Sequence, residues 1–535
     1  MHMNTGRMQV KKRNNISIEK GRKEAEDMQT SILKYLEEST DKYPDKIAVI
    51  DERGSLSYRE LLYDCKCIGS GLAVTISDHA PVGIYMEKSA DALCAFLGTV
   101  YAGGCYSFLN PELPDNRLRQ IQAVLQPCAI ITTGQMHDMA CRIFEGVTVL
   151  DIEELKQTEP EEDRLQKVEQ SRIDLDPLYI NFTSGSTGVP KGIVVGQRSV
   201  IDFIDCFTEL FHITEDDRIA NQAPFDFDVS VKDIYSCLKA GATLVIVPRR
   251  LFSAPTELLD YLTENRVTTL IWAVSALYLI TTFHGLDYKV PETVNKILFS
   301  GEVMPYKTLM DFKKHLPDAM YVNLYGPTEV TCNCTYHILE AERDYSDGIP
   351  IGTAFPNEDV FLLDTQEKRV EQPETIGEIC VRGTALALGY YNAPEQNEKH
   401  FTANPWNTAY PERIYRTGDL GKYNEKGELL FSGRKDFQIK YLGHRIELEE
   451  IEREMAKIDG VERCCCLFDE KHSRLKGIYT GAVEKGELHR IMKEKLPVFM
   501  VPGVLMRVEE MPMTKNGKID RKLLTEMTGR RKGDR

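Results

Sequence analysis

The sequence lacks several features that mark particular protein classes. Along its 535 residues no apolar run reaches about 18 residues, so we expect no transmembrane helix and no membrane insertion. The first residues are polar and basic and lack the apolar core of a secretory signal. The 14 cysteines include no C-x-x-C pair, so we expect reduced thiols and a cytoplasmic protein. A net charge of −16 argues against non-specific binding of nucleic acid.

The chain is longer than a single hydrophobic core usually allows, so more than one domain is expected. Short apolar runs such as KIAVID, TLVIVP and KILFSG alternate with segments of helical periodicity, which predicts a layered α/β fold with mixed sheets. Near residue 433 the pattern changes to short strands and an amphipathic helix. We therefore predict a tag-like or disordered extension at 1–27, a large N-terminal α/β domain at 28–433, a small mobile α+β domain at 434–525 and a basic tail at 526–535.

A loop rich in glycine and hydroxyl groups follows the apolar segment PLYINF. Glycines let backbone amides approach an anion, hydroxyls donate hydrogen bonds, and a lysine neutralises charge, so the loop is a candidate polyphosphate site. The GxxxxGK[ST] spacing of a P-loop is absent, which excludes that class, and a flexible Gly/Ser linker is the alternative. The candidate residues are Thr183, Ser184, Gly185, Ser186, Thr187, Gly188 and Lys191.

This loop, TSGSTGVPKG, resembles the phosphate loop of the adenylate-forming superfamily, which includes acyl-CoA synthetases, luciferases and the adenylation domains of nonribosomal peptide synthetases. Four more motifs follow in that family's order: YGPTE from 325, YRTGD from 415, GRKD from 433 and NGKID from 516. The resemblance runs from about residue 31 to residue 524. It implies ATP and Mg²⁺ as cofactors and a reaction in two steps, adenylation of a carboxylate and transfer of the acyl group to a thiol.

The resemblance implies a role for each residue of the nucleotide site. Tyr325 is expected to stack on adenine, Thr328 to bond the α-phosphate and Glu329 to hold magnesium, for which a carboxylate is a suitable hard ligand. Asp419 is expected to accept hydrogen bonds from both ribose hydroxyls, and Arg434 to add a ribose or phosphate contact.

The C-terminal motifs imply a lysine and a hinge. Lys518 is the expected catalytic lysine, because a cation that bridges the attacking carboxylate and the α-phosphate stabilises the transition state without proton transfer. Lys440 is the competing lysine and ranks lower. Asp436 is the expected hinge, and Gly443 with His444 is expected to line the tunnel for the thiol.

The segment FDFDVS indicates which acid is activated. Asp228 resembles the aspartate with which amino-acid-activating members bind the substrate ammonium, although Asp226 lies two residues away and a helix N-cap is the structural alternative. An acyl-CoA ligase would lack this aspartate, which makes that activity the less favoured one. The substrate pocket is expected to contain Asp228, Val229, Lys232, Trp272, Leu298, Ser300, Leu324, Cys332 and Asn333.

The mixed character of this pocket favours a small, polar or acidic amino acid. Trp272 would fill volume, whereas Lys232 and Asn333 offer donors, unless Lys232 pairs with a nearby aspartate instead. D-alanine is the competing substrate, because the neighbouring runs also resemble D-alanine carrier-protein ligases. The sequence has neither a condensation motif nor a GGxS carrier site, so we expect a phosphopantetheinylated carrier protein acting in trans as the partner.

Overall fold

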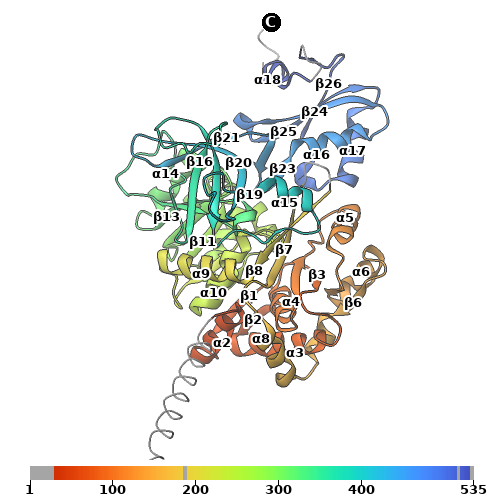
Figure 1. The fold of residues 1–535 in the computed structure, drawn as a ribbon, viewed down its shortest axis with the longest axis vertical. Coiled ribbons are helices and arrows are strands. Elements are labelled where there is room, and N and C mark those ends of the chain that lie inside the picture. The colour runs from red at the N-terminus through yellow and green to blue at the C-terminus, as the bar shows by residue number, and fades with distance from the viewer. Residues whose placement is uncertain (1–28, 185–188, 515–518, 530–535) are drawn as a thin grey trace, which may run out of the picture.

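The computed structural model describes residues 29–184, 189–514 and 519–529. Most of the large body is built on two sheets with helices on their faces, so the predicted α/β class with mixed sheets is confirmed (Figure 1). No helix in the described ranges is both long and apolar enough to cross a bilayer.

The first sheet has nine strands, parallel in its centre and antiparallel at both edges. Its spatial order is β15 (Thr353–Ala354), β14 (Thr335–Ile338), β13 (Met320–Tyr325), β12 (Lys296–Ser300), β11 (Thr269–Ala273), β9 (Arg218–Asn221), β10 (Thr243–Ile246), β1 (Ile47–Asp51) and β2 (Gly54–Ser57).

The second sheet has seven strands and carries the predicted phosphate loop between two antiparallel neighbours, β7 and β8. Its spatial order is β18 (Gly389–Tyr390), β8 (Lys191–Gly196), β7 (Pro177–Thr183), β4 (Cys105–Phe108), β3 (Pro81–Tyr85), β5 (Ala129–Thr132) and β6 (Thr148–Asp151).

Helices pack against the sheets through their apolar faces. One core cluster joins both sheets through α2 (Leu33–Lys42), α3 (Tyr58–Leu72), α4 (Ala90–Tyr101), α9 (Gln197–Leu210) and α10 (Val229–Ala240). A second cluster packs α11 (Pro255–Glu264), α12 (Val274–Thr282), α13 (Gly285–Tyr288) and α14 (Tyr306–His315) against the nine-stranded sheet. A third packs α5 (Asp115–Leu125) and α6 (His137–Ile143) against the seven-stranded sheet, and α7 (Ile152–Lys156) and α8 (Glu162–Ser171) follow in sequence.

A smaller sheet leads into the C-terminal segment. It contains β16 (Glu358–Leu363), β17 (Gly377–Gly383), β20 (Arg413–Tyr423), β19 (Phe401–Ala403) and β21 (Leu429–Arg434), with α15 (Pro394–His400) directly before β19. Strand β21 ends at Arg434, next to the boundary predicted from the sequence.

The C-terminal segment has a hydrophobic cluster of its own and lies at the end of the molecule opposite α2 (Figure 1). It consists of the hairpin β22 (Gln438–Tyr441) and β23 (His444–Glu447), the sheet β24 (Val461–Asp469), β25 (Arg474–Gly481) and β26 (Val504–Arg507), and the helices α16 (Leu448–Ala456), α17 (Lys485–Lys495) and α18 (Arg521–Gly529).

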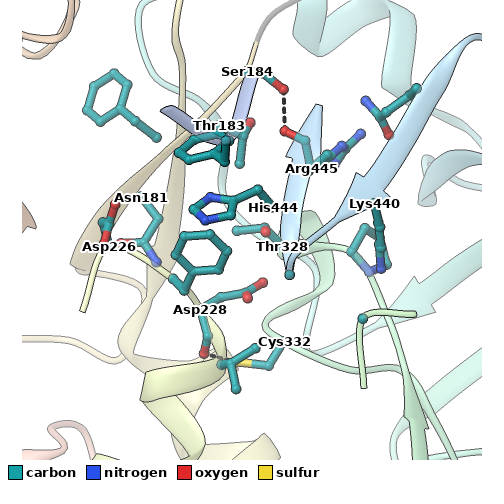
Figure 2. Close-up of a pocket in the computed structure, with 18 of the residues that line it drawn as sticks. Asn181, Thr183, Ser184, Asp226, Asp228, Thr328, Cys332, Lys440, His444 and Arg445 are labelled. Carbon is teal, nitrogen blue, oxygen red and sulfur yellow. Dashed lines mark hydrogen bonds between the residues drawn. The ribbon is translucent and has the colours of Figure 1, made fainter. Parts of the chain in front are cut away.

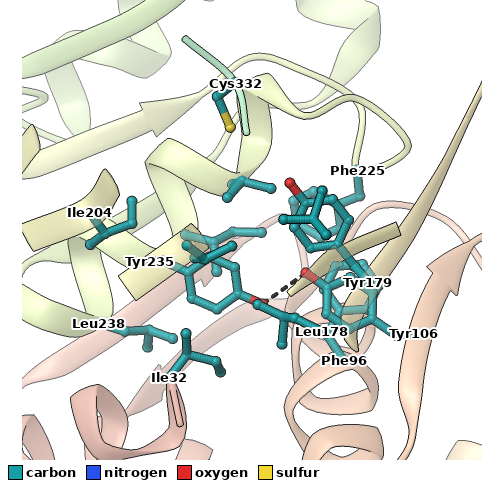
Figure 3. Packing of buried hydrophobic residues seen from close by; sticks show 14 of the residues in the cluster. Ile32, Phe96, Tyr106, Leu178, Tyr179, Ile204, Phe225, Tyr235, Leu238 and Cys332 are labelled. Atoms are coloured by element: carbon teal, nitrogen blue, oxygen red, sulfur yellow. Dashed lines mark hydrogen bonds between the residues drawn. The ribbon is translucent and has the colours of Figure 1, made fainter. Parts of the chain in front are cut away.

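Aromatic residues connect the two large sheets in the main core (Figure 3). Phe96 of α4 stacks on Tyr106 of β4 with ring centroids 4.3 Å apart. The Tyr106 hydroxyl lies 2.8 Å from the hydroxyl of Tyr235 on α10, and both side chains are buried. This contact holds α10, whose N-terminus borders the candidate site, against the seven-stranded sheet.

We predict that Tyr235→Phe destabilises the fold, because it leaves the buried Tyr106 hydroxyl without this hydrogen bond. A loss of about 1–3 kcal/mol in the free energy of unfolding is expected from urea denaturation. Tyr63→Phe is the matched control: Tyr63 is 51% exposed, so its change should stay within about 0.5 kcal/mol. Equal effects of the two substitutions would contradict the proposed contribution of the Tyr106–Tyr235 contact.

Candidate active site

A cavity lies where the carboxyl ends of β7, β12 and β13 meet the C-terminal hairpin β22–β23 (Figure 2). The carboxyl ends of parallel strands are the usual binding edge of an α/β sheet, because the loops that follow them project to the same side. Residues from both parts of the chain line this cavity: Asn181, Thr183, Ser184, Asp226, Phe227, Asp228, Val229, Ser300, Thr328, Cys332, Asn333, Asp419, Arg434, Lys440, Gly443, His444, Arg445 and Phe499, among others. Motifs separated by hundreds of residues therefore converge on one space.

Glu329 provides a buried carboxylate beside this cavity. It lies in a short 3₁₀ turn, Thr328–Val330, and is 1% exposed. Arg445 donates to both carboxylate oxygens, at 3.0 and 2.7 Å, and the Tyr390 hydroxyl donates at 2.7 Å. Burial alone raises the pKa of Glu329, but Arg445 and Tyr390 outweigh it and lower the pKa to about 2. The carboxylate is therefore ionised whenever this pairing exists.

The donor chemistry around Glu329 fits a magnesium ion that is completed by phosphate. In the described part of the chain no cluster of three or more His, Cys, Asp or Glu side chains could form a metal cage. Magnesium is commonly held by one or two carboxylates together with phosphate oxygens and water. Glu329, one residue from Thr328 in the cavity wall, is a carboxylate of this kind, and both of its oxygens are paired with Arg445 in this structure.

The residues expected to bind the ribose contact one another. Tyr325 is 7% exposed, and its hydroxyl donates to Asp419 Oδ2 at 2.6 Å. Arg434 pairs with the other oxygen of Asp419 and also binds Asp436 through two nitrogens, at 2.6 and 2.8 Å. The expected hinge residue, Asp436, is thus tied to the expected ribose residues. The Lys440 ammonium lies 6.0 Å from the centre of the Tyr325 ring.

Part of the predicted phosphate loop lies within the described residues. Thr183 and Ser184 line the cavity, and the Ser184 hydroxyl donates to the carbonyl of Arg445 at 2.6 Å (Figure 2). Lys191 begins β8, and its ammonium lies 5.9 Å from the Tyr390 ring. The other predicted members, Gly185, Ser186, Thr187 and Gly188, lie outside the described residues, as does Lys518.

Asp228 and Asp226 both line the cavity but have different partners. Asp226 accepts a hydrogen bond from Asn110 at 3.2 Å, and burial raises its pKa to about 6. Burial also raises the pKa of Asp228, opposed by the hydroxyl of Thr328 and by Lys232. Asp228 stands at the N-cap of α10, yet its side chain makes no capping hydrogen bond. Its carboxylate is therefore directed to the cavity and Thr328 rather than to helix capping.

The predicted pocket residues separate into two groups. Val229, Ser300, Cys332 and Asn333 line the cavity with Asp228. Lys232, Leu298, Leu324 and Trp272 are fully buried or nearly so and do not line it. Lys232 donates to Asn333 Oδ1 at 2.7 Å, so it supports the pocket wall from within the protein.

Trp272 lies on the side of β11 away from the cavity, which differs from the expectation. It belongs to the cluster beneath α11–α14, and its indole N–H donates to the Ala220 carbonyl at 2.8 Å. Consecutive side chains of a strand point to opposite faces, so the next residue, Ala273, takes the other side. A Cβ placed at Gly443 would lie 3.6 Å from the Ala273 Cβ, which locates Ala273 beside the hairpin.

The predicted thiol tunnel residues lie in the cavity wall. The amide of Gly443, at φ +80°, donates to Glu302 Oε1 at 2.9 Å. His444 stacks on Phe499 with centroids 3.5 Å apart and meets Phe227 edge-on at 4.5 Å. Burial lowers the pKa of His444 to about 3, helped by the charge of Arg249, so the imidazole is neutral.

The sequence analysis missed several residues at this site. Arg445 directly follows Gly443 and His444, which were predicted to lie at the site, so these neighbours could have indicated it. Its partner Glu329 is 116 residues away in the sequence. Tyr390 and Phe499 lie outside every recognised motif. Lys440, ranked below Lys518, is the lysine that the described structure brings into the cavity.

The sequence matches the AMP-binding enzyme family over residues 36–391, and the chain belongs to this family. Adenylate-forming ligases are among its relatives. The D-alanine–D-alanyl carrier protein ligase of Listeria welshimeri is 30% identical over 521 residues, covering 93% of this chain and 99% of that protein. Zwittermicin A synthase ZmaJ of Bacillus cereus is 30% identical over 511 residues, covering 93% and 95%.

Much longer synthases are also similar. Gramicidin S synthase 2 of Brevibacillus brevis is 32% identical over 513 residues, a match that covers 94% of this chain but only 11% of that protein. Among solved structures, the crystal structure of IdnL1 is 25% identical with a TM-score of 0.77, covering 91% of this chain and 98% of that one.

We predict that Trp272→Phe lowers stability without changing which acids are activated. Losing the indole donor removes its buried hydrogen bond to the Ala220 carbonyl, at a cost of about 1–3 kcal/mol in unfolding free energy. Ala273→Leu, which adds volume beside Gly443, is the matched variant and should slow the reaction instead. Thermal unfolding measures the effect on stability, and ATP–pyrophosphate exchange with several acids measures the effect on the reaction. An altered order of preferred acids in Trp272→Phe would contradict the placement of Trp272 away from the cavity.

Proposed function

We propose that this protein activates an amino acid with ATP and transfers it to the phosphopantetheine thiol of a carrier protein. In the first step a substrate carboxylate oxygen attacks the α-phosphorus and pyrophosphate leaves, giving an aminoacyl-adenylate. In the second step the thiol sulfur attacks the acyl carbon, AMP leaves, and the thiol loses its proton. The convergence of Asp228, Thr328 and Asp419 on one cavity is the observation that carries this proposal.

Different residues would bind the substrate and the nucleotide. Asp228 would bind the substrate ammonium, Thr328 the α-phosphate and Asp419 the ribose. Glu329 would hold magnesium, which supplies positive charge against the phosphates. The loop after Thr183 would enclose the phosphates, as its resemblance to the family's loop implies.

Asp228 favours an amino acid over a carboxylic acid without an amine. A carboxylate beside an apolar and hydroxylated wall costs free energy unless a cation pairs with it, and a substrate ammonium supplies that cation. This is the reason for ranking an acyl-CoA ligase activity below amino-acid activation.

We also propose which kind of side chain the amino-acid substrate has. Ser300 and Asn333 offer polar groups to the cavity, which supports a small polar or acidic amino acid. Lys232 already donates to Asn333, so the pocket wall presents the amide of Asn333 rather than the lysine. D-alanine is the second candidate, supported by the similarity to the Listeria welshimeri ligase across 99% of that protein. Pyrophosphate exchange with serine, aspartate, L-alanine, D-alanine and a fatty acid distinguishes these substrates.

We predict that Asp228→Ala raises the KM for the amino acid and leaves ATP affinity nearly unchanged, because only the ammonium partner is removed. Loss of one member of a buried charge pair corresponds to about 3–5 kcal/mol. Steady-state pyrophosphate exchange gives the KM, and equilibrium binding of ATP gives the control. Asp226→Ala is the matched variant; a larger KM effect in Asp226→Ala would transfer the role to Asp226.

We predict that Lys518→Ala abolishes adenylate formation while largely preserving thiol transfer from supplied aminoacyl-adenylate. Loss of such an electrostatic group typically costs about a hundredfold or more in rate. Rapid-quench assays measure the two half-reactions separately. If Lys440→Ala blocks adenylation and Lys518→Ala does not, the assignment of the catalytic lysine is reversed.

A further inference from the structure

Lys88 is a half-buried lysine outside the cavity wall that holds a loop leading into the cavity. It lies between β3 and α4, beside the seven-stranded sheet. Its ammonium donates to three successive backbone carbonyls, those of Asn221 at 3.1 Å, Gln222 at 3.2 Å and Ala223 at 3.4 Å. A lysine ammonium has three N–H donors, so these contacts use all of them. Lys88 therefore acts on the backbone after β9 and has no donor left for a substrate.

The loop that Lys88 holds carries both aspartates of the cavity. It runs from the end of β9 to the start of α10, and Asp226 and Asp228 lie within it. Asn110, which follows β4, donates to the carboxylate of Asp226 at 3.2 Å. This loop of the nine-stranded sheet is thus fixed at two points by residues that follow strands β3 and β4 of the seven-stranded sheet.

Asn221 extends the hold of Lys88 to the helix after the loop. Its side-chain amide donates to Asp233 of α10 at 2.7 Å, and both side chains are buried. Asp228 stands between these two anchors, directly before α10, and its side chain makes no capping hydrogen bond. The backbone on both sides of Asp228 therefore decides where its carboxylate meets the cavity.

From these contacts we propose that Lys88 is a positioning residue for amino-acid recognition, which fixes the backbone between β9 and α10 so that Asp228 faces the substrate ammonium. This inference rests on the proposed function and adds a residue that acts on the substrate only through this loop. The expected nucleotide residues Thr328 and Asp419 lie on other segments, after β13 and within β20. Loss of the Lys88 ammonium should therefore affect amine binding more than ATP binding.

Lys46 is the matched control, because it makes the same kind of contact at the other end of α10. It is also half-buried, and its ammonium donates to the carbonyl of Gly241, the C-cap of α10, at 2.5 Å and to the carbonyl of Glu215. Neither carbonyl belongs to the loop that carries Asp228. Each lysine thus stabilises backbone carbonyls, so an effect of lowered stability alone would be common to variants of both.

The test compares each amino acid with the acid that lacks its amine: serine with 3-hydroxypropanoate, aspartate with succinate, and alanine of either hand with propanoate. ATP–pyrophosphate exchange gives kcat/KM for each acid. Lys88→Met keeps the side-chain stem and removes the donors, and it should lower the preference for the aminated acid by about tenfold or more, through the KM of the amino acid. Equilibrium binding of ATP should be nearly unchanged. Lys46→Met should leave the preference within about twofold of the wild type.

A conservative variant and a double variant separate positioning from general stability. Lys88→Arg keeps a cation with N–H donors and should restore part of the preference. Lys88→Met combined with Asp228→Asn should lower the preference no further than Asp228→Asn alone, because both act through one contact. An unchanged preference in Lys88→Met, an equal loss in Lys46→Met, or multiplying effects in the double variant would overturn the proposal.

Hydrogen–deuterium exchange gives a readout that does not depend on catalysis. In Lys88→Met the backbone amides of residues 224–231 should exchange about tenfold faster than in the wild type or more, whereas Lys46→Met should act near Gly241. If Lys88→Met does not fold, Lys88→Gln, which retains two N–H donors, decides both measurements with a smaller expected loss. Unchanged deuterium uptake at 224–231 in the folded variant would refute the dependence of the loop on Lys88. Failure of the proposed function would appear separately, as an absence of amino-acid-dependent pyrophosphate exchange in the wild type.

Discussion

A buried carboxylate needs a positive partner, and the arrangement of this site depends on that constraint at Glu329. The side chain is almost completely inaccessible, yet its pKa of about 2 keeps it ionised. Arg445 is the cation that pairs with it, and Tyr390 adds a hydrogen bond. The position of the C-terminal hairpin is therefore linked to the charge state of one glutamate in the large body. Apart from this ion pair, each part of the chain has a hydrophobic cluster of its own.

Asp419, on the cavity wall, is likewise a buried carboxylate with positively charged neighbours. Asp419 meets Arg434 directly, and Lys440 lies close enough for the charge of Asp419 to oppose the burial that lowers the lysine's pKa. Both Glu329 and Asp419 thus face a cation from the chain beginning at Arg434. Asp228 differs in its hydrogen-bonding partner, which is the hydroxyl of Thr328, while Lys232 and Lys440 act on it through their charges.

The sequence predicted the class of fold and the motif residues because these depend on local spacing. Strand periodicity located the strands, and the five motifs located Thr328, Glu329 and Asp419 near one cavity. Alignment by motif placed Trp272 in the pocket, but in a strand an error of one residue exchanges the two faces, and Ala273 faces the hairpin instead. The Arg445–Glu329 pair was not predictable, because nothing local couples residues 116 apart.

The packing of His444, stacked on Phe499 and edge-on to Phe227, makes this arrangement of the hairpin sensitive to acid. Its pKa falls from 6.5 to about 3 on burial, so the buried ring excludes a proton that the freed ring would bind. Above pH 6.5 docking is proton-neutral at this residue. Below that value a solvent-exposed imidazole would bind a proton that the buried ring excludes, so the burial of His444 becomes progressively less favourable as the pH falls towards 3. The aromatic contacts of His444 in the cavity wall thereby set an acid limit to this arrangement of the hairpin.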